Sequence, residues 1–386
     1  MVPKKKIAVL FPAFLKGGAE SVALWILESL KPEYDLTLIT FSAIDVNQLN
    51  ELYGTNLKVQ DFVLDIPYKK TPIPPILINR YSLFTIRQHL LLRYYKKINH
   101  RFDLAIGAFN EMDMGRPGIQ YLNSPMFGKG HEKGRSYLGY PDSYLRRIYH
   151  RIFETISGFS SERMKENLSL GNSEWTAQLF RDLYQMDVGV LYPPIALKVI
   201  DVPWVDRENG FICISRIVPE KKIERAIVIL EHVHNLGFDI HLHLVSSNFE
   251  TQYRNKILKI QAEHASWVHL HEDLSRDQLA NLLVHHRYGI HVRENEQFGI
   301  SVAEMVQAGC IPFVPSQGGQ IEIVGNNPIL QFGNEDEAVN KIVKVLKNPG
   351  LQQDLISKLS KDKNRFGAEI FCRNIRAHVE KILVEN

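Results

Sequence analysis

Two glutamates with seven residues between them form the pattern in this sequence that is most suggestive of chemistry. Glu296 and Glu304 flank a segment that contains Phe298, Gly299 and Ile300. A loop that runs into a helix would place one carboxylate on the loop and the other about two turns along the helix. The backbone N–H groups between them would lie at a helix N-terminus, which favours phosphate or sugar hydroxyl groups. The alternative is a solvated glutamate pair beside an ordinary buried helix.

A pair of cations follows the strand that we predict over residues 211–215. Arg216 and Lys221 come directly after this strand, at the carboxyl end where ligands of α/β proteins bind. Arg216 offers a planar fork that suits paired phosphate oxygens, and Lys221 offers a compact point charge. The alternative interpretation is a solvated basic turn.

The elements that must position these residues alternate between strands and helices. The apolar run 7–11, the glycine turn at Gly17 and Gly18, helical spacing over 19–30 and a second apolar run at 36–41 predict a βαβ unit. Further strands are predicted at 104–107, 118–122 and 168–171. The two glycines alone are too few for a dinucleotide-binding fingerprint.

Adjacent prolines at 193 and 194 end this series and predict a linker that runs to about residue 207. A second series of alternating elements follows. Its strands are predicted at 211–215, 240–245, 268–270, 289–292 and 311–314, and its helices from 219 and at 251–264, 275–284 and 302–308. The pattern over 340–383 is helical throughout.

These patterns predict an α/β protein with two facing Rossmann-like domains. The first domain would span 1–195 and the second 208–365. A C-terminal helix over 366–386 would cross back and pack on the first domain. A length of 386 residues is consistent with two cores.

Composition excludes several classes of protein. A net charge of +3 on 386 residues argues against a nucleic-acid partner. The three cysteines, Cys213, Cys310 and Cys372, lie far apart without zinc-binding spacing, so we expect no metal and a reducing, cytoplasmic location.

Glu111 and Asp113 lack the surroundings of a metal-binding acidic motif and are interpreted as solvated carboxylates. The basic, apolar start breaks at Pro12 and is interpreted as a strand, and no run of about 18 apolar residues predicts a transmembrane helix.

One segment is strongly basic. Residues 66–101 contain no Asp or Glu, and they carry cations interspersed with aromatic and aliphatic residues: Lys69, Lys70, Arg80, Arg87, Arg93, Lys96, Lys97 and Arg101. Such a stretch can lie on the anionic inner face of a membrane or guide a phosphorylated lipid or acidic glycan. The alternative is a helix with one buried apolar face and one solvated basic face.

Taken together, the two site patterns resemble those of the retaining glycosyltransferases of family 4, also called glycosyl transferases group 1, which have the GT-B fold. That family shows an Arg-x4-Lys turn, followed some eighty residues later by Glu-x7-Glu with Phe-Gly inside it. Four further segments resemble the family: Gly17 to Glu20, Asn172 to Thr176, Tyr192 to Pro194 and Gly318 to Val324. The resemblance covers nearly the whole chain.

The resemblance implies a role for each matching residue. Arg216 and Lys221 would hold the donor diphosphate and stabilise the charge that grows on the leaving group. Glu304 would bind the ribose and Glu296 a sugar hydroxyl, with backbone N–H groups of 298–300 completing the pocket. Gly17 and Gly18 would let the backbone approach the phosphates closely. The family reacts on one face of the sugar without a protein base or a metal, so no cofactor is implied beyond the donor itself.

One position departs from the family. Many relatives have a first-domain histidine where this chain has Asn123. An asparagine can hydrogen bond to a sugar hydroxyl but cannot carry a proton or a positive charge. His131 could stand in for the missing histidine, although an isolated histidine near glycines is usually just exposed.

The sequence therefore predicts a metal-independent hexosyltransferase of polysaccharide biosynthesis. Its donor would be a UDP- or GDP-linked sugar, with GDP-mannose favoured by the likeness of 172–176 and 192–194 to the mannosyltransferase branch. Its acceptor would be a glycan or a lipid-linked glycan. The alternatives are a nucleotide-sugar epimerase or hydrolase of the same fold, and a degenerate transferase that acts as a binding subunit.

Overall fold

The computed structural model describes residues 3–15, 17–68, 84–126 and 144–385. It divides into two compact units, and each is considered by itself: Met1–Pro194 with Ala368–Asn386, and Ile195–Gly367. The residues that we interpreted as a linker after Ile195 thus belong to the second unit. They include a 3-10 turn at Trp204–Asp206.

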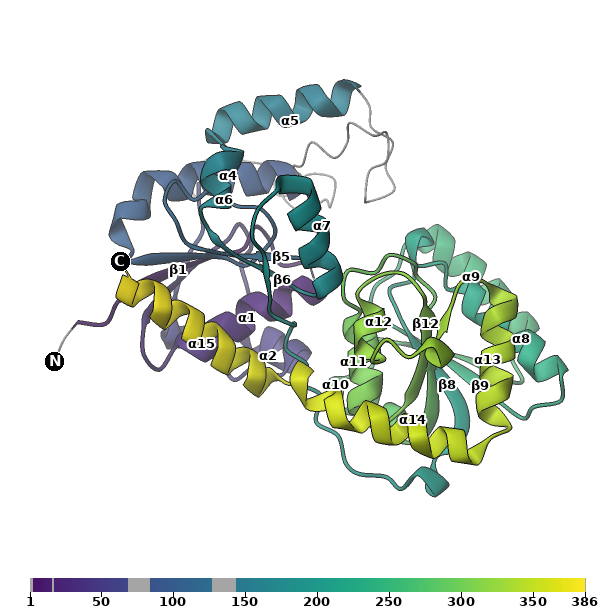
Figure 1. Ribbon diagram of the computed structural model, residues 1–386. Helices are drawn as coiled ribbons and strands as arrows, with labels where there is room; N and C mark the ends of the chain where they lie inside the picture. The colour runs from purple at the N-terminus through teal and green to yellow at the C-terminus, as the bar shows by residue number, and fades with distance from the viewer. Residues whose placement is uncertain (1–2, 16, 69–83, 127–143, 386) are drawn as a thin grey trace. The chain divides into compact units, whose positions relative to one another are not determined.

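The first unit is built on a parallel sheet with the strand order β3-β2-β1-β4-β5-β6-β7 among the described residues (Figure 1). The interior strand β1 pairs with β2 through Ile7 and Leu36 and with β4 through Ile7 and Leu104. The strands are β1 (Lys6–Leu10), β2 (Asp35–Ile39), β3 (Val63–Asp65), β4 (Leu104–Gly107), β5 (Ile119–Leu122), β6 (Leu168–Gly171) and β7 (Gly189–Val190). Burial of β1 on both sides explains its unbroken apolar sequence.

Helices cover both faces of this sheet. They are α1 (Gly18–Leu30), α2 (Val46–Tyr53), α4 (Phe84–Ile98), α5 (Tyr144–Ser157), α6 (Ser161–Lys165), α7 (Glu174–Tyr184) and α15 (Ala368–Glu385). Ser173 begins α7 by accepting a hydrogen bond from the Thr176 N–H group at 3.0 Å. Short 3-10 turns lie at Val59–Asp61 and Asn99–Arg101.

The C-terminal helix α15 packs beside α1 in the first unit (Figure 1). Phe371, Ile375 and Val379 repeat at helical spacing and are 2% exposed or less, and they join the core that contains Val22 and Leu27. The helical pattern predicted over 340–383 is confirmed, and it comprises parts of three helices, because Asn348 caps a new helix at Pro349 and a 3-10 turn at Lys363–Phe366 precedes α15.

The second unit has its own parallel sheet, with the order β10-β9-β8-β11-β12-β13 among the described residues. Its strands are β8 (Glu208–Ile214), β9 (His241–Ser246), β10 (Val268–Glu272), β11 (His286–Ile290), β12 (Ile311–Pro315) and β13 (Gln331–Phe332). The two parallel sheets with their helices confirm the predicted α/β class with two Rossmann-like domains.

The helices of the second unit are α8 (Glu224–Asn235), α9 (Thr251–Glu263), α10 (Arg276–Val284), α11 (Ile300–Gln307), α12 (Gln320–Ile323), α13 (Glu335–Leu346) and α14 (Pro349–Asp362). Two further 3-10 turns lie at Pro219–Lys221 and Pro328–Leu330. Leu283 and Met305, from α10 and α11, pack on Ile212 and Val245 of the sheet. Among all the described helices, none combines the length and the hydrophobicity that a membrane span requires.

Candidate functional site

A buried ion pair forms at the carboxyl ends of two neighbouring strands of the second unit. Lys221 ends the turn that follows β8, and Glu296 lies between β11 and α11. Lys221 Nζ lies 2.6 Å from Glu296 Oε2, and the two side chains are 14% and 13% exposed. The structure therefore brings together two of the residues that the sequence singled out, 75 positions apart.

Two further side chains surround the same carboxylate. Arg293 Nη1 lies 3.3 Å and His291 Nε2 lies 3.6 Å from Glu296 Oε2. Burial raises the pKa of Glu296, but the charge of Lys221, the His291 contact and Arg293 together hold it well below its ordinary value. Burial lowers the pKa of His291, so this imidazole is neutral at pH 7. Glu296 is thus a carboxylate held between cations.

Lys221 keeps hydrogen-bonding capacity beyond this pair. An ammonium group has three N–H donors, and among the described residues Lys221 Nζ hydrogen bonds only to Glu296. Burial lowers the pKa of Lys221, while Glu296 opposes that effect. A buried ammonium group with unused donors is suited to an anionic ligand.

The N-terminus of α11 lies next to Glu296 in the chain. Gly299 precedes the helix with φ of +103°, a conformation that glycine adopts readily, and no side chain caps the helix there. Phe298 is buried, with its ring centroid 5.6 Å from that of Phe366. This anchors the chain so that the first N–H groups of α11, starting at Ile300, can serve a ligand.

A second loop holds the backbone of Glu296. The Gly319 N–H group donates to the Glu296 carbonyl oxygen at 2.7 Å. Gly318 has φ of +116°, and a Cβ atom there would lie 2.6 Å from the same oxygen. Glycine is therefore required at position 318, which begins the stretch Gly318 to Val324 that resembles the family.

Glu304 lies on α11 and has a different partner from Glu296. Its Oε1 atom lies 2.5 Å from Arg276 Nη1 at the start of α10, and its side chain is 7% exposed. The interpretation of Glu296 and Glu304 as a solvated pair is therefore wrong. Sequence reasoning missed Arg276, which reaches Glu304 from another helix, and it missed Arg293 and His291, which shortly precede Glu296 in the chain.

Arg216 lies immediately beyond the end of β8, as predicted. It is half-buried, and its carbonyl oxygen accepts a hydrogen bond from the Val218 N–H group at 3.0 Å in the turn that leads to Lys221. Its role toward a diphosphate stays a prediction.

In the first unit, the glycine turn before α1 is closed by a glutamate. Gly17 is the N-cap of α1, and Gly18 begins the helix. The Gly17 N–H group donates to Glu20 Oε1 at 3.1 Å, and the Leu15 N–H group donates to the same oxygen. Tyr53 donates its hydroxyl proton to Glu20 Oε2 at 2.8 Å. Some donors at this turn are thus occupied, and binding of phosphate by Gly17 and Gly18 stays a prediction.

Asn123 lies at the carboxyl end of β5 with one unused donor group. Its N–H group donates to Asn110 Oδ1 at 2.9 Å, and its Oδ1 accepts from Asn172 Nδ2 at 3.3 Å. Its buried Nδ2 has no hydrogen-bond partner among the described residues. A buried amide donor of this kind normally has a partner, so a ligand hydroxyl fits here. His131 lies outside the described residues.

The interpretation of Glu111 and Asp113 as solvated is wrong, since both are fully buried. Asp113 Oδ2 lies 2.8 Å from both Lys96 Nζ and Arg163 Nη2. Glu111 Oε1 accepts from the Tyr184 hydroxyl at 2.7 Å. These carboxylates hold the first unit together.

The basic segment 66–101 is only partly a surface. Residues 69–83, with Lys69, Lys70 and Arg80, lie outside the described residues. Arg87 is 4% exposed, and Lys96 is engaged with Asp113. The exposed cations of the described part are Arg93, Lys97 and Arg101.

The donor-side loops of the second unit bring together no metal-ligating cluster among the described residues. Three histidines elsewhere in this unit do form such a cluster: His241, His243 and His286. The expectation of no metal, drawn from the cysteine spacing, stays a prediction. The three histidines come from two strands, and His241 and His286 are 45 positions apart in the sequence, so no short spacing reveals the cluster.

Residues 200–362 match the family model described as glycosyl transferases group 1. The second unit is a glycosyl transferases group 1 domain. Two curated relatives carry the same description, GDP-Man:Man(3)GlcNAc(2)-PP-Dol alpha-1,2-mannosyltransferase. That of Dictyostelium discoideum is 27% identical over 45% of this chain and 38% of its own length. That of Caenorhabditis elegans is 24% identical over 62% of this chain and 56% of its own length. The chain thus matches about half of each relative or less.

Solved structures resemble the whole chain in fold. HepE of Anabaena, crystallised with UDP and glucose, has a TM-score of 0.68 at 15% identity and covers 98% of this chain and 100% of its own. Sucrose-phosphate synthase of Thermosynechococcus elongatus has a TM-score of 0.73 at 13% identity, with 99% and 100% covered. These likenesses confirm the predicted GT-B fold class.

Proposed function

We propose that this chain is a retaining, metal-independent hexosyltransferase that uses a nucleotide diphosphate sugar as its donor. The observation that carries the proposal is the buried Lys221 ammonium, which is held by Glu296 and has N–H donors to spare. The group 1 domain supports the reaction class. The descriptions of the curated relatives support GDP-mannose as the donor and a lipid-linked glycan as the acceptor.

The donor would bind at the carboxyl ends of β8 and β11. Lys221 and Arg216 would contact the diphosphate and stabilise the negative charge that develops there as the glycosidic bond breaks. The uncapped N-terminus of α11 would add backbone N–H donors. Because two protein cations would take the place that a metal ion often fills, no divalent ion is required for this step.

The two glutamates would recognise the neutral parts of the donor. Glu296 would accept a hydrogen bond from a sugar hydroxyl, since cations fix its carboxylate in the charged, accepting form. Glu304 would accept from ribose hydroxyls, with Arg276 holding its orientation. The first unit would contribute the free amide donor of Asn123 toward a sugar hydroxyl, and the turn at Gly17 and Gly18 toward the phosphates.

A lipid-linked acceptor would bring the chain to the cytoplasmic face of a membrane. Arg93, Lys97 and Arg101 are exposed near the end of α4 and could contact anionic headgroups, each contributing about 1 kcal/mol. Co-sedimentation with anionic vesicles should fall when all three are changed to Gln, while GDP affinity stays the same. Equal sedimentation of both proteins would contradict the membrane contact and leave the donor site intact.

Donor binding is tested by calorimetry with GDP, UDP and guanosine. We expect GDP to bind more tightly than UDP, and guanosine to bind weakly because it lacks the diphosphate. Lys221→Ala should weaken GDP binding roughly tenfold or more, since a hydrogen bond to a charged group contributes about 1.5–3 kcal/mol. The matched control is Lys222→Ala, whose lysine is adjacent and exposed. Equal affinity in both variants would contradict the assignment of Lys221.

The reaction is tested by incubating GDP-mannose with a lipid-linked oligosaccharide and determining the anomeric configuration of the product. Transfer with retained configuration supports the proposal. Conversion of the donor without acceptor would show an epimerase, and release of free sugar would show a hydrolase. Donor binding without any turnover would show a binding subunit. Each of these three outcomes overturns the transferase assignment.

A further inference from the structure

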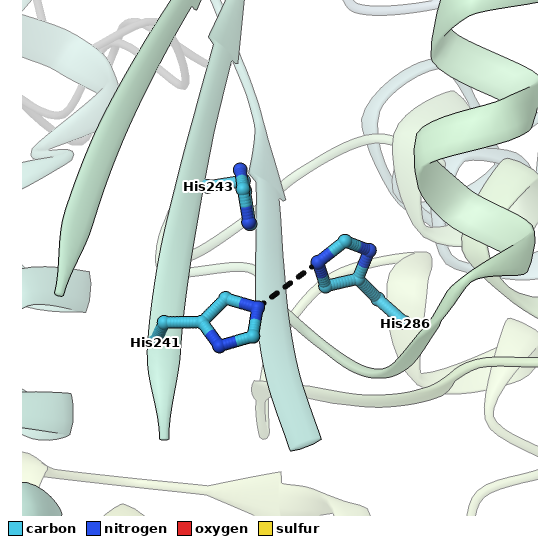
Figure 2. A group of neighbouring side chains, drawn as sticks. All are labelled: His241, His243 and His286. Atoms are coloured by element: carbon cyan, nitrogen blue, oxygen red, sulfur yellow. Dashed lines mark hydrogen bonds between the residues drawn. The ribbon is translucent and has the colours of Figure 1, made fainter. Parts of the chain in front are cut away.

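Histidines from β9, β10 and β11 gather on one face of the second sheet. His241 and His243 alternate along β9, His269 and His271 do so along β10, and His286 begins β11. Register pairs His243 with His269 across the two strands. His241, His243 and His286 each direct a ring nitrogen toward the others, and these atoms all lie within 4.8 Å of one another (Figure 2).

A glycine makes this approach possible. Strand β8 runs between β9 and β11, and its Gly210 pairs with His241. A Cβ atom at Gly210 would lie 2.2 Å from His241 Nε2 and 2.5 Å from His286 Cδ2. Because Gly210 has no side chain, the two imidazoles meet above the strand, with their Nε2 atoms 3.0 Å apart. That separation is close to the ligand-to-ligand distance around one small metal ion, for which each N–metal bond is about 2.0–2.1 Å.

The surroundings of the rings are those of metal ligands. His286 Nδ1 lies 2.6 Å from the Leu282 carbonyl oxygen, which can only accept, so the proton is on Nδ1 and the Nε2 lone pair faces the cluster. His243 Nδ1 lies 2.7 Å from His271 Nε2, a second outer partner. Glu208 Oε2 lies 3.4 Å from His241 Nε2 and 3.9 Å from His286 Nε2, close enough to supply an oxygen ligand.

Burial keeps these imidazoles in the ligand form. His286 is 3% exposed, and His241 and His243 are half-buried. Burial, reinforced by the neighbouring histidines, lowers the pKa of His243 to about 3, and burial also lowers the pKa of His241 and His286.

We propose that His241, His243 and His286 bind one Zn²⁺ ion, with Glu208 available as a fourth ligand. Three neutral imidazoles and a carboxylate match the ligand preferences of zinc, and Mg²⁺ instead prefers oxygen ligands alone. A Cβ atom at Gly210 would contact both rings, so the space for the ion depends on a glycine at this position.

The site is separate from the donor site within the same unit. His241 and His286 are the first residues of β9 and β11, whereas Lys221 and Glu296 follow the carboxyl ends of β8 and β11. A metal ion there would link β9 to β11 across β8 at the amino end of the sheet. Its role is to brace the unit and not to take part in sugar transfer.

The test is titration of ZnCl₂ into the full chain, prepared without a histidine tag and stripped of metal, with MgCl₂ as the comparison ion. We expect one Zn²⁺ per chain, a rise in melting temperature with Zn²⁺ and no response to Mg²⁺. His243→Gln and His286→Gln should each weaken Zn²⁺ binding by about 100-fold. The matched control is His285→Gln, because His285 is adjacent but contacts the Asn281 carbonyl oxygen outside the cluster.

Two further variants distinguish a loss of Zn²⁺ binding from a loss of folding. Glu208→Gln alters an exposed side chain, 62% accessible, and should weaken Zn²⁺ binding with the metal-free melting temperature unchanged. Gly210→Ala should abolish binding while every histidine remains. Co²⁺ in place of Zn²⁺ should give the visible absorption of a tetrahedral site, absent in His243→Gln. Failure of the wild-type chain to bind Zn²⁺ at one per chain, or equal binding by the histidine variants and His285→Gln, would overturn the proposal.

Discussion

Each unit of this chain contains a buried lysine paired with a buried carboxylate, and the two pairs differ in what the lysine has left to donate. In the first unit, Lys96 Nζ donates to Asp113 Oδ2 at 2.8 Å, to the Ser157 carbonyl oxygen at 3.1 Å and to the Gly158 carbonyl oxygen at 2.9 Å. All three of its donors are used. In the second unit, Lys221 Nζ has Glu296 as its one hydrogen-bond partner in the described part of the chain.

The carboxylates differ in the same way. Asp113 accepts from Lys96, from Arg163 through both oxygens and from the backbone N–H groups of Ser160 and Gly115. Glu296 has charged neighbours mainly on one oxygen. A buried ion pair with every donor and acceptor used stabilises a fold, whereas one with unused donors can bind a ligand. The number of donors and acceptors in use therefore distinguishes the Lys96–Asp113 pair, as a structural pair, from the Lys221–Glu296 pair, which we propose binds a ligand.

The largest expected effect is on stability in the first unit. Lys96→Met removes three hydrogen bonds and leaves Asp113 with Arg163 as its remaining cation. Breaking a buried pair in this way costs about 3–5 kcal/mol in the free energy of unfolding. Urea unfolding measures the change, and GDP affinity at a temperature where the variant is folded should stay the same. A loss below about 1 kcal/mol would mean that this pair is no more important than a surface pair.

The second effect is on catalysis in the second unit. Lys221→Met should lower the turnover number by about 10²–10³, the usual result of removing one donor that stabilises developing charge. Its free energy of unfolding should change less than that of Lys96→Met, because Lys221 makes one hydrogen bond in the described part of the chain whereas Lys96 makes three. Steady-state kinetics and urea unfolding of both variants test this together. A variant that unfolds easily but transfers sugar normally would reverse the roles of the two pairs.

A third effect sharpens the comparison through pH. Burial raises the pKa of Asp113, but hydrogen bonds from Arg163 and Lys96 outweigh it, so the pKa lies below the ordinary 3.8. Because the folded pKa is depressed, the stabilisation by Asp113 is fully present above about pH 4–5 and is lost as the pH falls through the folded pKa. The difference in free energy of unfolding between wild type and Asp113→Asn should therefore narrow between about pH 5 and pH 3. Over this range the Asp113 carboxyl takes up a proton in the unfolded chain before it does so in the folded chain. A difference that stays constant over this range would show that the charge of Asp113 is unimportant.

The smallest expected effect concerns chelation. EDTA should leave the initial rate of sugar transfer unchanged, since Lys221 and Arg216 supply the positive charge at the diphosphate. The same treatment should lower the melting temperature by removing Zn²⁺ from the histidine cluster. Activity that disappears in EDTA and returns with Mg²⁺ or Mn²⁺ would assign the charge compensation to a metal ion.

The placement of Arg216 and Glu296 at one edge of the sheet was predictable because each comes after a strand, and their role toward a donor stays a prediction. Arg216 comes at the end of an apolar run, and Glu296 comes before a glycine and a helical stretch, so local pattern placed both at the same edge of one sheet. The long-range partners were not predictable. Arg276 reaches Glu304 from another helix, and Lys96 and Arg163 reach Asp113 from opposite directions along the chain.

Other failures have specific physical causes. The helical pattern over 340–383 did not show where one helix ends and the next begins, which is at Asn348 and at the 3-10 turn Lys363–Phe366. Asp113 was interpreted as solvated because isolated acidic residues usually are, and its burial is compensated by residues distant in sequence. The histidines of β9 and β11 alternate with apolar residues and so matched a strand pattern without indicating a cluster.

The return of α15 to the first unit has a consequence for biosynthesis. Phe371, Ile375 and Val379 complete the core beside α1, yet they are translated after every residue of the second unit. On the ribosome, the second unit has its whole chain available before the first unit can bury its last apolar face. We therefore expect the nascent first unit to wait with the α1 surface uncovered, a period in which chaperones would bind it. For the same reason, we expect the second unit to complete its fold before the first unit, although the first unit is synthesised earlier.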